Sequence, residues 1–361
     1  MAMRSLSGRR KWATVSTVSR PSPPQSRRGR CFPMLDPAIA TALAADDQHI
    51  AIAGAGGWIG LATLDLLERA LGDDLPRRVS CYGSATRLLT LRSGRQVRQT
   101  PLADLKSLEA GRIWLLHFAF QTKDRAEAMS EADYRAVNDA ISATVLDAAR
   151  TLPVEALFVA SSGAATRASD PLASPAMRLY GQMKRDDEDR FAAWAQDSGR
   201  RAVIGRIFNI TGPYINKHQA YAIANFILDA LADRPIEVRA PRQVFRAYVA
   251  IRELMSLVFA LMARTDGGVT RFDTGGQELE LEAVARAVAQ AVGGGGTSVN
   301  RAFVSDPAAD RYVGDSAAYA ALLARYGIEP ISLDQQIVET AADMRLIAAA
   351  EPSGLASPEP A

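Results

Sequence analysis

Residues 49–60 read HIAIAGAGGWIG, and this stretch decides the fold. The apolar run His49–Ala53 predicts a buried strand, and a helix is expected directly after the glycines, over Leu61–Ala70. The glycines at 54, 57 and 60 have the spacing G-x-x-G-x-x-G. A strand, a glycine turn and a helix in this order are typical of a dinucleotide site, because the glycines let the backbone approach a pyrophosphate that the helix N-terminus attracts. The plainer alternative is a flexible turn that binds nothing.

Apolar runs typical of buried strands alternate with helical patterns along the chain as far as Pro213. Because such alternation is typical of parallel sheets with right-handed crossovers, we predict an α/β fold with a doubly wound parallel sheet over 46–211. After Pro213 strand and helix patterns no longer alternate regularly, which predicts a smaller C-terminal α/β substrate-binding lobe over 212–350. Within it, residues 247–265 are expected to pack back on the first domain. The further strands expected in the sheet are Arg78–Tyr82, Val97–Leu102, Ile113–Phe118, Ala156–Ala160 and Arg201–Phe208.

The composition is that of an ordinary globular protein in a reducing compartment, and we expect a cytoplasmic location. The two cysteines make no disulfide framework, and the three histidines lack metal-ligand spacing, so no metal site is expected. The longest apolar runs are too short to span a membrane. Residues 1–35 carry eight basic residues and no acidic one, whereas the remaining chain holds 34 basic and 40 acidic residues. A body with that balance does not predict a nucleic-acid partner.

The two ends of the chain lack the pattern of folded domains. Residues 1–45 are expected to be either a disordered or targeting-like extension or, in part, an artefact of start-codon choice, with Met34 as the true start. The last residues, 351–361, contain proline and serine and are expected to be frayed.

The strand expected after the first helix ends in the residues Tyr82-Gly-Ser-Ala-Thr-Arg87, which include no acid. Dinucleotide folds selective for NAD often place an acid there to hold the ribose 2′-hydroxyl, whereas a serine and an arginine can accept a 2′-phosphate. Ser84 and Arg87 therefore make NADP at least as good a candidate as NAD. Arg87 is equally consistent with a solvated surface charge.

A tyrosine and a lysine four residues apart carry the expected chemistry. Tyr180 and Lys184 lie in a helical pattern that runs through about Trp194, so both side chains lie on one helix face. A free tyrosine, with a pKa of about 10, is a poor base at neutral pH, and a nearby lysine ammonium would lower that pKa. Such a tyrosine can take a proton from a hydroxyl while hydride leaves for a nicotinamide. Ser161 and Ser162 follow another strand, where open parallel sheets bind ligands.

With these segments in place, the chain resembles the extended short-chain dehydrogenase/reductase family of nucleotide-sugar epimerases and dehydratases, over roughly residues 48–343. Each motif alone is weak, but all of them occur in order and at the family's spacing. The matching segments are Ala53–Gly60, Asp104-Leu105, His117-Phe118-Ala119, Tyr134–Asn138, Ser161-Ser162, Tyr180 with Lys184, Arg206–Pro213, and Arg246–Val249 with Glu253-Leu254.

The resemblance implies a Rossmann domain that binds NAD or NADP, a lobe for the nucleotide half of a sugar substrate, and a possible homodimer. Tyr180 would be the general acid/base, and Lys184 would lower its pKa and hold the nicotinamide ribose. Ser162 would hydrogen-bond the reacting oxygen, and Asn138 would support a water relay to the lysine. The residues expected at the cofactor are Gly54, Gly57, Trp58, Ile59, Gly60, Ser84, Arg87, Asp104, Leu105, Phe118, Ala119, Ser161, Tyr180, Lys184 and Ile207, and those expected at the substrate are Ser162, Asn209 and Arg246.

Departures from the family pattern exclude some of the reactions that the family catalyses from those expected here. Dehydratases of the family carry Asp-Glu after the catalytic hydroxyl residue, whereas Gly163 and Ala164 follow Ser162 here, which disfavours elimination. Ala247 replaces the usual aspartate after Arg246, so the identity of the nucleotide stays open. We therefore expect redox chemistry or epimerisation at a nucleotide-sugar carbon. The alternatives are an NADP(H)-dependent reductase or dehydrogenase of a keto-sugar or other carbonyl compound and a non-catalytic dinucleotide sensor.

Overall fold

The computed structural model describes residues 33–294 and 296–350. The expectations for residues 1–32 and for 351–361 lie outside these described residues. The expected N-terminal extension over residues 1–45 was too long, because Pro37–Ala45 form a helix and Leu35 and Leu43 are buried in the core. None of the helices in the described part of the chain combines the length and apolar character needed to cross a membrane.

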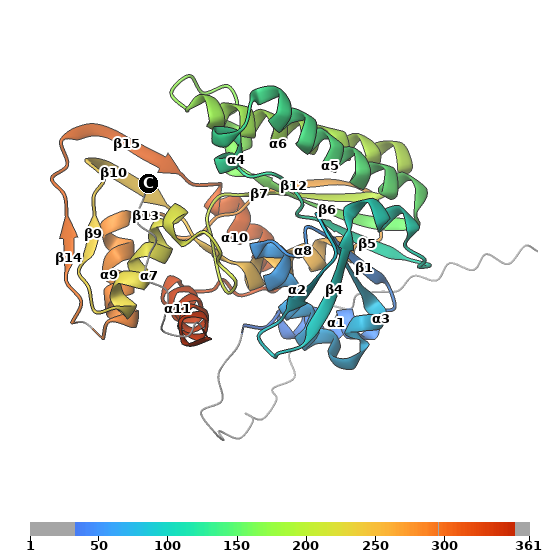
Figure 1. Ribbon diagram of the computed structural model, residues 1–361, viewed down its shortest axis with the longest axis horizontal. Coiled ribbons are helices and arrows are strands. Elements are labelled where there is room, and N and C mark those ends of the chain that lie inside the picture. Colours follow the sequence, from blue (N-terminus) through green and yellow to red (C-terminus); the bar gives the residue numbers. More distant parts are fainter. Residues whose placement is uncertain (1–32, 295, 351–361) are drawn as a thin grey trace, which may run out of the picture. The chain divides into compact units, whose positions relative to one another are not determined.

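A mostly parallel sheet of eight strands organises the first domain (Figure 1). The strand β1 lies inside the sheet because it pairs with β5 on one side and β2 on the other, both in parallel. Only the edge strand β3 runs antiparallel to its described neighbour, β4. Across the sheet the order is β12 (Gly268–Asp273), β7 (Arg201–Ile207), β6 (Val154–Ser162), β5 (Ile113–His117), β1 (His49–Ala53), β2 (Val79–Gly83), β4 (Gln96–Pro101) and β3 (Arg87–Thr90). This arrangement confirms the predicted α/β fold with a doubly wound parallel sheet.

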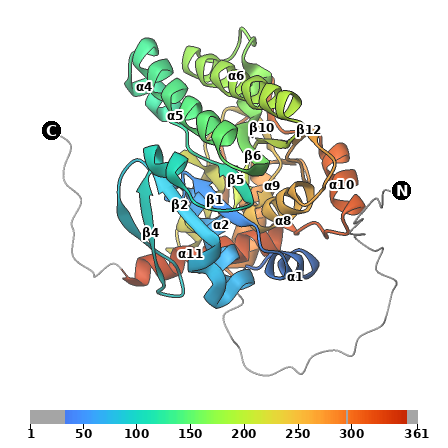
Figure 2. The ribbon, with the colours of Figure 1, turned by 90° about the vertical axis from the view of Figure 1, so that its right-hand side faces the viewer.

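Helices cover both faces of the sheet, as Figure 2 shows. On one face pack α1 (Pro37–Ala45), α2 (Trp58–Leu71) and α8 (Ile251–Met262), whose buried side chains share one core with β1 and β6. On the other face pack α5 (Glu131–Thr151) and α6 (Pro175–Ser198). Burial on both faces explains why β1 and β5 are apolar along most of their length rather than alternating. Shorter elements are α3 (Leu75–Arg78), α4 (Lys123–Ala128) and the parallel pair β8 (Ile210–Thr211) and β11 (Val249–Ala250).

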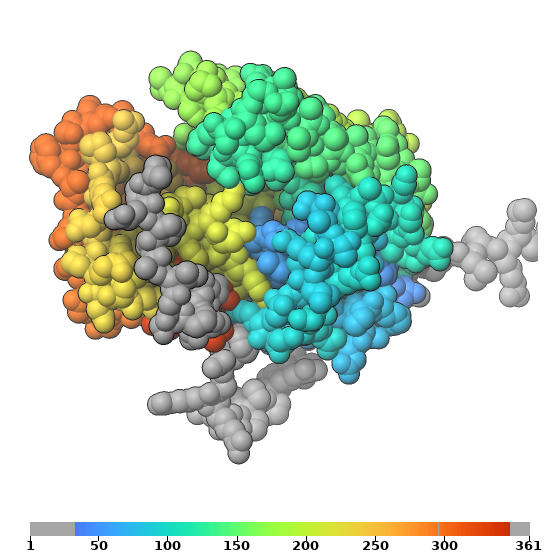
Figure 3. Space-filling model, in the orientation of Figure 1, coloured from blue at the N-terminus to red at the C-terminus, as the bar shows by residue number. Residues whose placement is uncertain are grey.

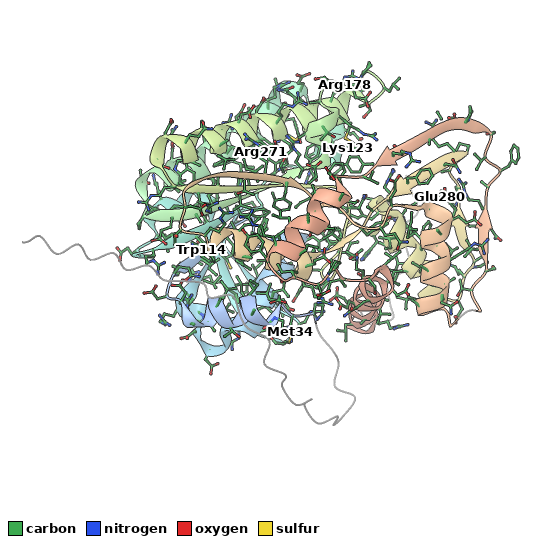
Figure 4. The ribbon with its side chains drawn as sticks, turned by 180° about the vertical axis from the view of Figure 1, so that it is seen from behind. Met34, Trp114, Lys123, Arg178, Arg271 and Glu280 are labelled. Carbon is green, nitrogen blue, oxygen red and sulfur yellow. The ribbon has the colours of Figure 1, made fainter. Side chains whose placement is uncertain are left out.

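Two labelled side chains in Figure 4 mark these layers. Trp114 of β5 stacks on Phe259 of α8, with ring centroids 6.4 Å apart and an angle of 19° between the rings. Arg271 of the edge strand β12 reaches α6, where its guanidinium lies 3.3 Å from a carboxylate oxygen of Asp189. Both helical layers pack on the sheet through apolar side chains, and the α6 layer has this ion pair in addition.

We call the other elements that follow residue 211 the C-terminal lobe. They include a small sheet with the order β13-β10-β15 and the pair β14-β9. The elements are α7 (Ala222–Leu231), β9 (Ile236–Val238), β10 (Arg242–Arg246), β13 (Leu279–Glu280), α9 (Leu281–Val292), β14 (Val299–Arg301), β15 (Asp306–Tyr312), α10 (Ser316–Arg325) and α11 (Leu333–Ala350). The strands β3, β10 and β15 were not expected from the sequence.

The last helix, α11, holds the backbone where the chain passes from the first domain to the C-terminal lobe. Gln336, Thr340 and Asp343 lie on one stripe of α11, at a spacing of four and three residues. Gln336 accepts a hydrogen bond from the Thr211 hydroxyl at 2.8 Å, and Thr340 accepts one from Gly212 N–H at 3.0 Å. Asp343 accepts one from Tyr214 N–H at 2.7 Å. Residues 211–214 are thus fixed by side chains more than 120 positions away.

Candidate active site

The glycine turn, residues 54–60, has the geometry of a cradle for a phosphate. Gly54 has a φ of +90°, and a Cβ there would lie 2.5 Å from the Ala119 nitrogen. A Cβ on Gly60 would lie 2.3 Å from the Gly54 carbonyl oxygen, so both positions require glycine for the fold itself. At Gly57 a Cβ would meet nothing closer than 3.5 Å. The middle glycine is therefore not required by packing, and its bare backbone suits the approach of a ligand.

The helix α2 begins at this turn without a side-chain cap. Its N-cap is Gly57, which cannot satisfy the first N–H groups of the helix. The indole N–H of Trp58 donates to Pro213 C=O at 2.8 Å, and its ring meets Tyr221 edge-on at 5.1 Å. Ile59 packs against the core. Contacts of Trp58 and Ile59 with a cofactor would therefore come from their backbone at the helix N-terminus, which attracts anions.

The segments expected around an adenosine lie beside the turn. Gly54 N–H and Ala55 N–H both donate to Tyr82 C=O, at 2.8 and 3.1 Å, which joins the turn to the end of β2. Ser84 and Arg87 are exposed just beyond that end. Asp104 is exposed and Leu105 is fully buried, in the short 3₁₀ helix Leu102–Ser107. In Figure 3 the surface is hollowed where blue residues are visible between cyan and yellow segments.

The loop after β5 is clamped by α5. Tyr134 donates from its hydroxyl to Gln121 C=O at 2.6 Å, and the amide oxygen of Asn138 accepts from Gln121 N–H at 2.8 Å. The Asn138 amide also donates to Tyr134 C=O at 3.2 Å. Asn138 thus fixes the loop that carries Phe118, Ala119 and Phe120, and its expected role in a water relay stays a prediction.

Three hydroxyl groups meet at the end of β6. Ser162 ends this strand, and its hydroxyl lies 3.3 Å from the hydroxyl of Tyr312, the last residue of β15. Tyr180 of α6 is half-buried, and its phenol lies close enough to Ser162 for the serine hydroxyl to lower its pKa in part. Its ring also meets Phe120 edge-on at 5.9 Å. The structure therefore brings Tyr180 and Ser162 together as expected and adds Tyr312, which the sequence analysis missed.

Lys184 lies one helical turn beyond Tyr180 and is buried. Its ammonium donates to Ala160 C=O at 2.9 Å and sits 3.7 Å from the centre of the Phe120 ring. Burial lowers the pKa of Lys184 to about 8, and the carboxylates of Asp187 and Glu188 offset part of that effect. Lys184 is thus a lysine whose charge changes near neutral pH, at the base of the site.

The pKa of Tyr180 differs from the expectation. Burial raises this pKa above that of a free tyrosine, and the Ser162 hydroxyl lowers it only in part. The nearby hydroxyls of Tyr312 and Tyr134 raise it further. The expected lowering by Lys184 is not found because the Lys184 ammonium is directed to Ala160 and Phe120 instead. Tyr180 is accordingly a neutral phenol in the ligand-free protein.

Some expected site residues are engaged in the framework instead. The Ser161 hydroxyl donates to Glu188 at 2.6 Å, and Glu188 also accepts two hydrogen bonds from Arg206 Nε and Nη2, at 2.8 and 2.7 Å. This buried network joins β6, α6 and β7 next to Lys184. Ile207, at the end of β7, is buried and belongs to the core on the opposite face from α6. Direct contacts of Ser161 and Ile207 with a cofactor stay predictions.

The other two residues expected at the substrate, Asn209 and Arg246, contact Tyr312. The Asn209 amide donates to Ala247 C=O at 3.2 Å and to Tyr312 C=O at 3.1 Å, so it positions the tyrosine. Arg246 pairs with Asp310 at 2.8 Å and lies over the Tyr312 ring, 5.9 Å from its centre. Arg167 lies over the same ring at 5.3 Å. For Arg246 to bind a phosphate, the phosphate would have to replace Asp310.

His117, at the end of β5, is packed in the core of the protein. It is 3% exposed, meets Phe191 edge-on at 5.2 Å, and burial lowers its pKa to about 3. A neutral imidazole with so low a pKa is not an acid at physiological pH. Among the described residues no group of three or more His, Cys, Asp or Glu side chains is placed to hold a metal ion.

These features together fit a dinucleotide. The uncapped start of α2 and the bare backbone at Gly57 suit its pyrophosphate. Lys184 has one N–H bonded to Ala160, and an ammonium carries two further donors for a ribose. Gln99, which is 1% exposed beside the end of β2, has a side-chain carbonyl oxygen without a partner in the described structure. A buried oxygen without a hydrogen-bond partner, such as that of Gln99, indicates a polar site that a ligand would complete.

The alkaline limit of activity is expected to follow Lys184. Because the charged form is lost as pH rises through about 8, kcat/KM should fall above that pH. Lys184→Arg keeps a charge at every accessible pH, so its profile should stay flat to about pH 9.5 even if its rate is lower. A pH–rate profile of both proteins tests this, and an identical alkaline limb in the variant would contradict it.

Stability provides a second readout that needs no substrate. Between pH 8 and 10.5 the unfolded state binds more protons at this lysine than the folded state does, because the folded pKa is the lower one. The free energy of unfolding should therefore rise with pH in that window, relative to Lys184→Met. Urea titrations at pH 8 and 10 measure the difference.

Comparison with known proteins identifies the family of the chain. The sequence profile of the NAD dependent epimerase/dehydratase family matches residues 50–274. The chain belongs to this family. The matched segment includes the glycine turn, Ser162, Tyr180 and Lys184, and it ends before Tyr312.

A curated relative in the family is UDP-glucuronic acid decarboxylase 1 of Xenopus tropicalis, 29% identical over 117 residues. That match covers 32% of this chain and 28% of the relative, so it concerns only a part of each protein. Members of the family are enzymes of several reactions, and the match does not choose among them.

Solved structures of the family share the fold. UDP-glucose 4-epimerase of Thermus thermophilus, complexed with NAD, superposes with a TM-score of 0.59 at 21% identity, over 82% of this chain and 99% of that one. The dTDP-glucose 4,6-dehydratase of Streptomyces venezuelae, with NAD and TYD bound, has a TM-score of 0.61 at 18% identity, over 84% and 98%. At such identities the likeness establishes the extended short-chain dehydrogenase/reductase fold alone.

Proposed function

We propose that the protein is an NAD(P)-dependent enzyme that oxidises and re-reduces a hydroxyl-bearing carbon of a nucleotide sugar, and thereby epimerises it. The observation that carries the proposal is the meeting of Ser162, Tyr180 and Tyr312 at the end of β6. The loop 118–120 contacts both this cluster and the glycine turn, through Phe120 and Ala119 respectively. A hydroxyl cluster would thus face the reactive end of a dinucleotide whose pyrophosphate lies at the turn.

The proposed roles follow from the geometry. Ser162 would donate to the reacting oxygen, and Tyr180 would take the hydroxyl proton in oxidation and return it in reduction. A bound oxidised nicotinamide supplies the hydride acceptor and a positive charge. That charge, together with an ammonium at Lys184, would lower the raised pKa of Tyr180 toward the range in which it can accept a proton. The hydroxyl of Tyr312 would hold a second substrate oxygen.

The space beside Ser162 favours this chemistry over elimination. A Cβ on Gly163 would lie 2.5 Å from the ring of Phe208, so no acidic side chain fits there without moving that ring. Ala164 is fully buried. An acid that could protonate a leaving hydroxyl therefore has no place at the two positions after Ser162.

The nucleotide half of the substrate is assigned to the face of the C-terminal lobe around Tyr312. Arg246 and Arg167 both lie over its ring and share Asp310 as an ionic partner, at 2.8 and 3.3 Å. A diphosphate could replace this single carboxylate between two guanidinium groups, which bind phosphates well. The related enzymes are named for UDP- and dTDP-sugars, which supports the same substrate class here.

The test is a turnover assay with a panel of UDP- and dTDP-hexoses. We expect an isomer of unchanged mass, detected by chromatography and NMR, with no lasting change in absorbance at 340 nm. Denaturing release should yield a nicotinamide dinucleotide from the purified protein. A panel in which no nucleotide sugar is isomerised would contradict the epimerase proposal.

A second candidate function is favoured by the end of β2, which has no acid. Without an acid at that position the protein can bind NADP(H), and in this case it would be a reductase that consumes NADP(H) while it reduces a keto-sugar or another carbonyl compound. The same assay distinguishes the two functions, because a reductase changes the absorbance at 340 nm in proportion to the product formed.

A further inference from the structure

The end of β2 contains an arginine that contacts the glycine turn. A Cβ placed on Gly56 would lie 1.6 Å from Nη2 of Arg87 and 2.6 Å from its Cζ, so the guanidinium lies against the turn. The Arg87 side chain makes no hydrogen bond or ion pair with any residue that the structure describes. An unpaired cation placed against the backbone of a dinucleotide turn is not explained by the fold.

The position where an acid would hold a ribose hydroxyl is closed by a neutral side chain. A Cβ on Gly83, the last residue of β2, would come within 2.4 Å of the Gln99 amide. Gln99 donates from Nε2 to Ala85 C=O at 2.8 Å, which fixes the amide, and its Oε1 has no partner among the described residues. That oxygen would lie 2.8 Å from a Cβ on Gly56, so it faces the same gap as Arg87.

We propose that the dinucleotide of this protein is NADP(H), with Arg87 pairing the 2′-phosphate and Gln99 accepting the neighbouring 3′-hydroxyl. The proposal rests on the proposed function only in taking a dinucleotide at the glycine turn. A phosphate dianion there meets a guanidinium that can bind it with two parallel hydrogen bonds. The segment 79–87 contains no carboxylate, which would repel the phosphate. With NAD(H), the Arg87 charge would gain no partner.

The chain offers a matched control at Arg98. In the antiparallel pair of β3 and β4, Arg87 lies opposite Gln99, and Leu88 lies opposite Arg98. Because successive side chains of a strand point to opposite faces, Arg98 lies on the face away from Arg87. Both arginines are exposed, so replacing either removes one surface charge. Only the loss of Arg87 removes a charge that faces the glycine turn.

The test measures binding without any sugar. Dissociation constants for NADPH, NADH, 2′,5′-ADP and 5′-ADP are determined by titration calorimetry for the wild type, Arg87→Ser and Arg98→Ser. We expect the wild type to bind NADPH and 2′,5′-ADP at least 10-fold more tightly than their unphosphorylated counterparts. Arg87→Ser should lose about 10- to 100-fold for the phosphorylated ligands, the size of a charged hydrogen bond, and less than 3-fold for the others. Arg98→Ser should leave all four constants within 3-fold.

Two results would overturn the proposal. One is a wild type that binds NADH as tightly as NADPH, and the other is an Arg87→Ser protein that weakens both dinucleotides equally. Should Arg87→Ser fold poorly by circular dichroism, Arg87→Lys keeps the charge but not the paired hydrogen bonds, and an intermediate loss specific to NADPH is then expected. If the NADP(H) proposal fails, the proposed function still stands or falls by the sugar assay, because that assay detects isomers and not the preferred dinucleotide.

Discussion

Replacing Tyr180 with phenylalanine is expected to lower kcat by about 10²- to 10⁴-fold, the usual contribution of a positioned acid/base group. The change removes only the hydroxyl, and the ring keeps its edge-on contact with Phe120. Ser162 keeps Tyr312 as a partner at 3.3 Å, so little stability should be lost. Steady-state rates on the converted nucleotide sugar, with melting curves and dinucleotide titrations on the same protein, measure these effects separately.

Tyr312→Phe is the matched control, because it removes a hydroxyl that contacts the same serine. Tyr312 comes from the C-terminal lobe and is expected to position the substrate, so its loss should raise KM and lower kcat by less than about 10-fold. If Tyr312→Phe were the variant with the large loss in kcat and Tyr180→Phe the mild one, the acid/base would be Tyr312. The assignment of Tyr180 would then be wrong.

The second large effect is expected at the glycine turn, where Gly54→Ala should destabilise the protein by about 2–5 kcal/mol. Part of this cost is the φ of +90°, and part is the contact of the new Cβ with the Ala119 nitrogen at 2.5 Å. Gly57→Ala meets no atom closer than 3.5 Å and should change the free energy of unfolding by less than about 1 kcal/mol. Urea unfolding without ligand measures both values.

The same two variants separate folding from binding. Gly57→Ala should fold normally yet bind a dinucleotide at least 10-fold more weakly, since its methyl group would stand between the turn and the pyrophosphate. A Gly57→Ala protein that binds as the wild type does would show that the phosphates do not approach this glycine. A stable Gly54→Ala protein would show that the turn can shift away from Ala119.

Much of the fold and part of the site could be predicted because the signals are local. The apolar strand before Gly54 and the spacing of Gly54 and Gly60 are properties of a few consecutive residues, and the structure explains two of these glycines by backbone contacts. Tyr180 and Ser162 were also found from local patterns, one at helical spacing and the other at a strand end. The acid/base role of Tyr180 and the oxygen-binding role of Ser162 stay predictions.

What could not be predicted depends on contacts between distant parts of the chain. Tyr312 lies 150 residues from Ser162, and no pattern in its own segment marks it as a site residue. The pKa of Tyr180 was expected to be lowered by Lys184, but burial and the neighbouring hydroxyls raise it. Sequence spacing places the lysine near the tyrosine, whereas the position of Phe120 over its ammonium is a matter of packing. Burial of that kind is visible only in three dimensions.

The stripe of Gln336, Thr340 and Asp343 on α11 has a consequence for recombining this protein with its relatives. The family segment ends at residue 274, yet these three side chains bind residues 211–214, two of them through backbone N–H groups and one through the Thr211 hydroxyl. A chimaera that exchanges the C-terminal lobe at Pro213 would separate Thr211 and Gly212 from Gln336 and Thr340, the side chains that bind them. Residues 211–214 and α11 should therefore come from the same parent protein, which places the junctions before residue 211 and after α11.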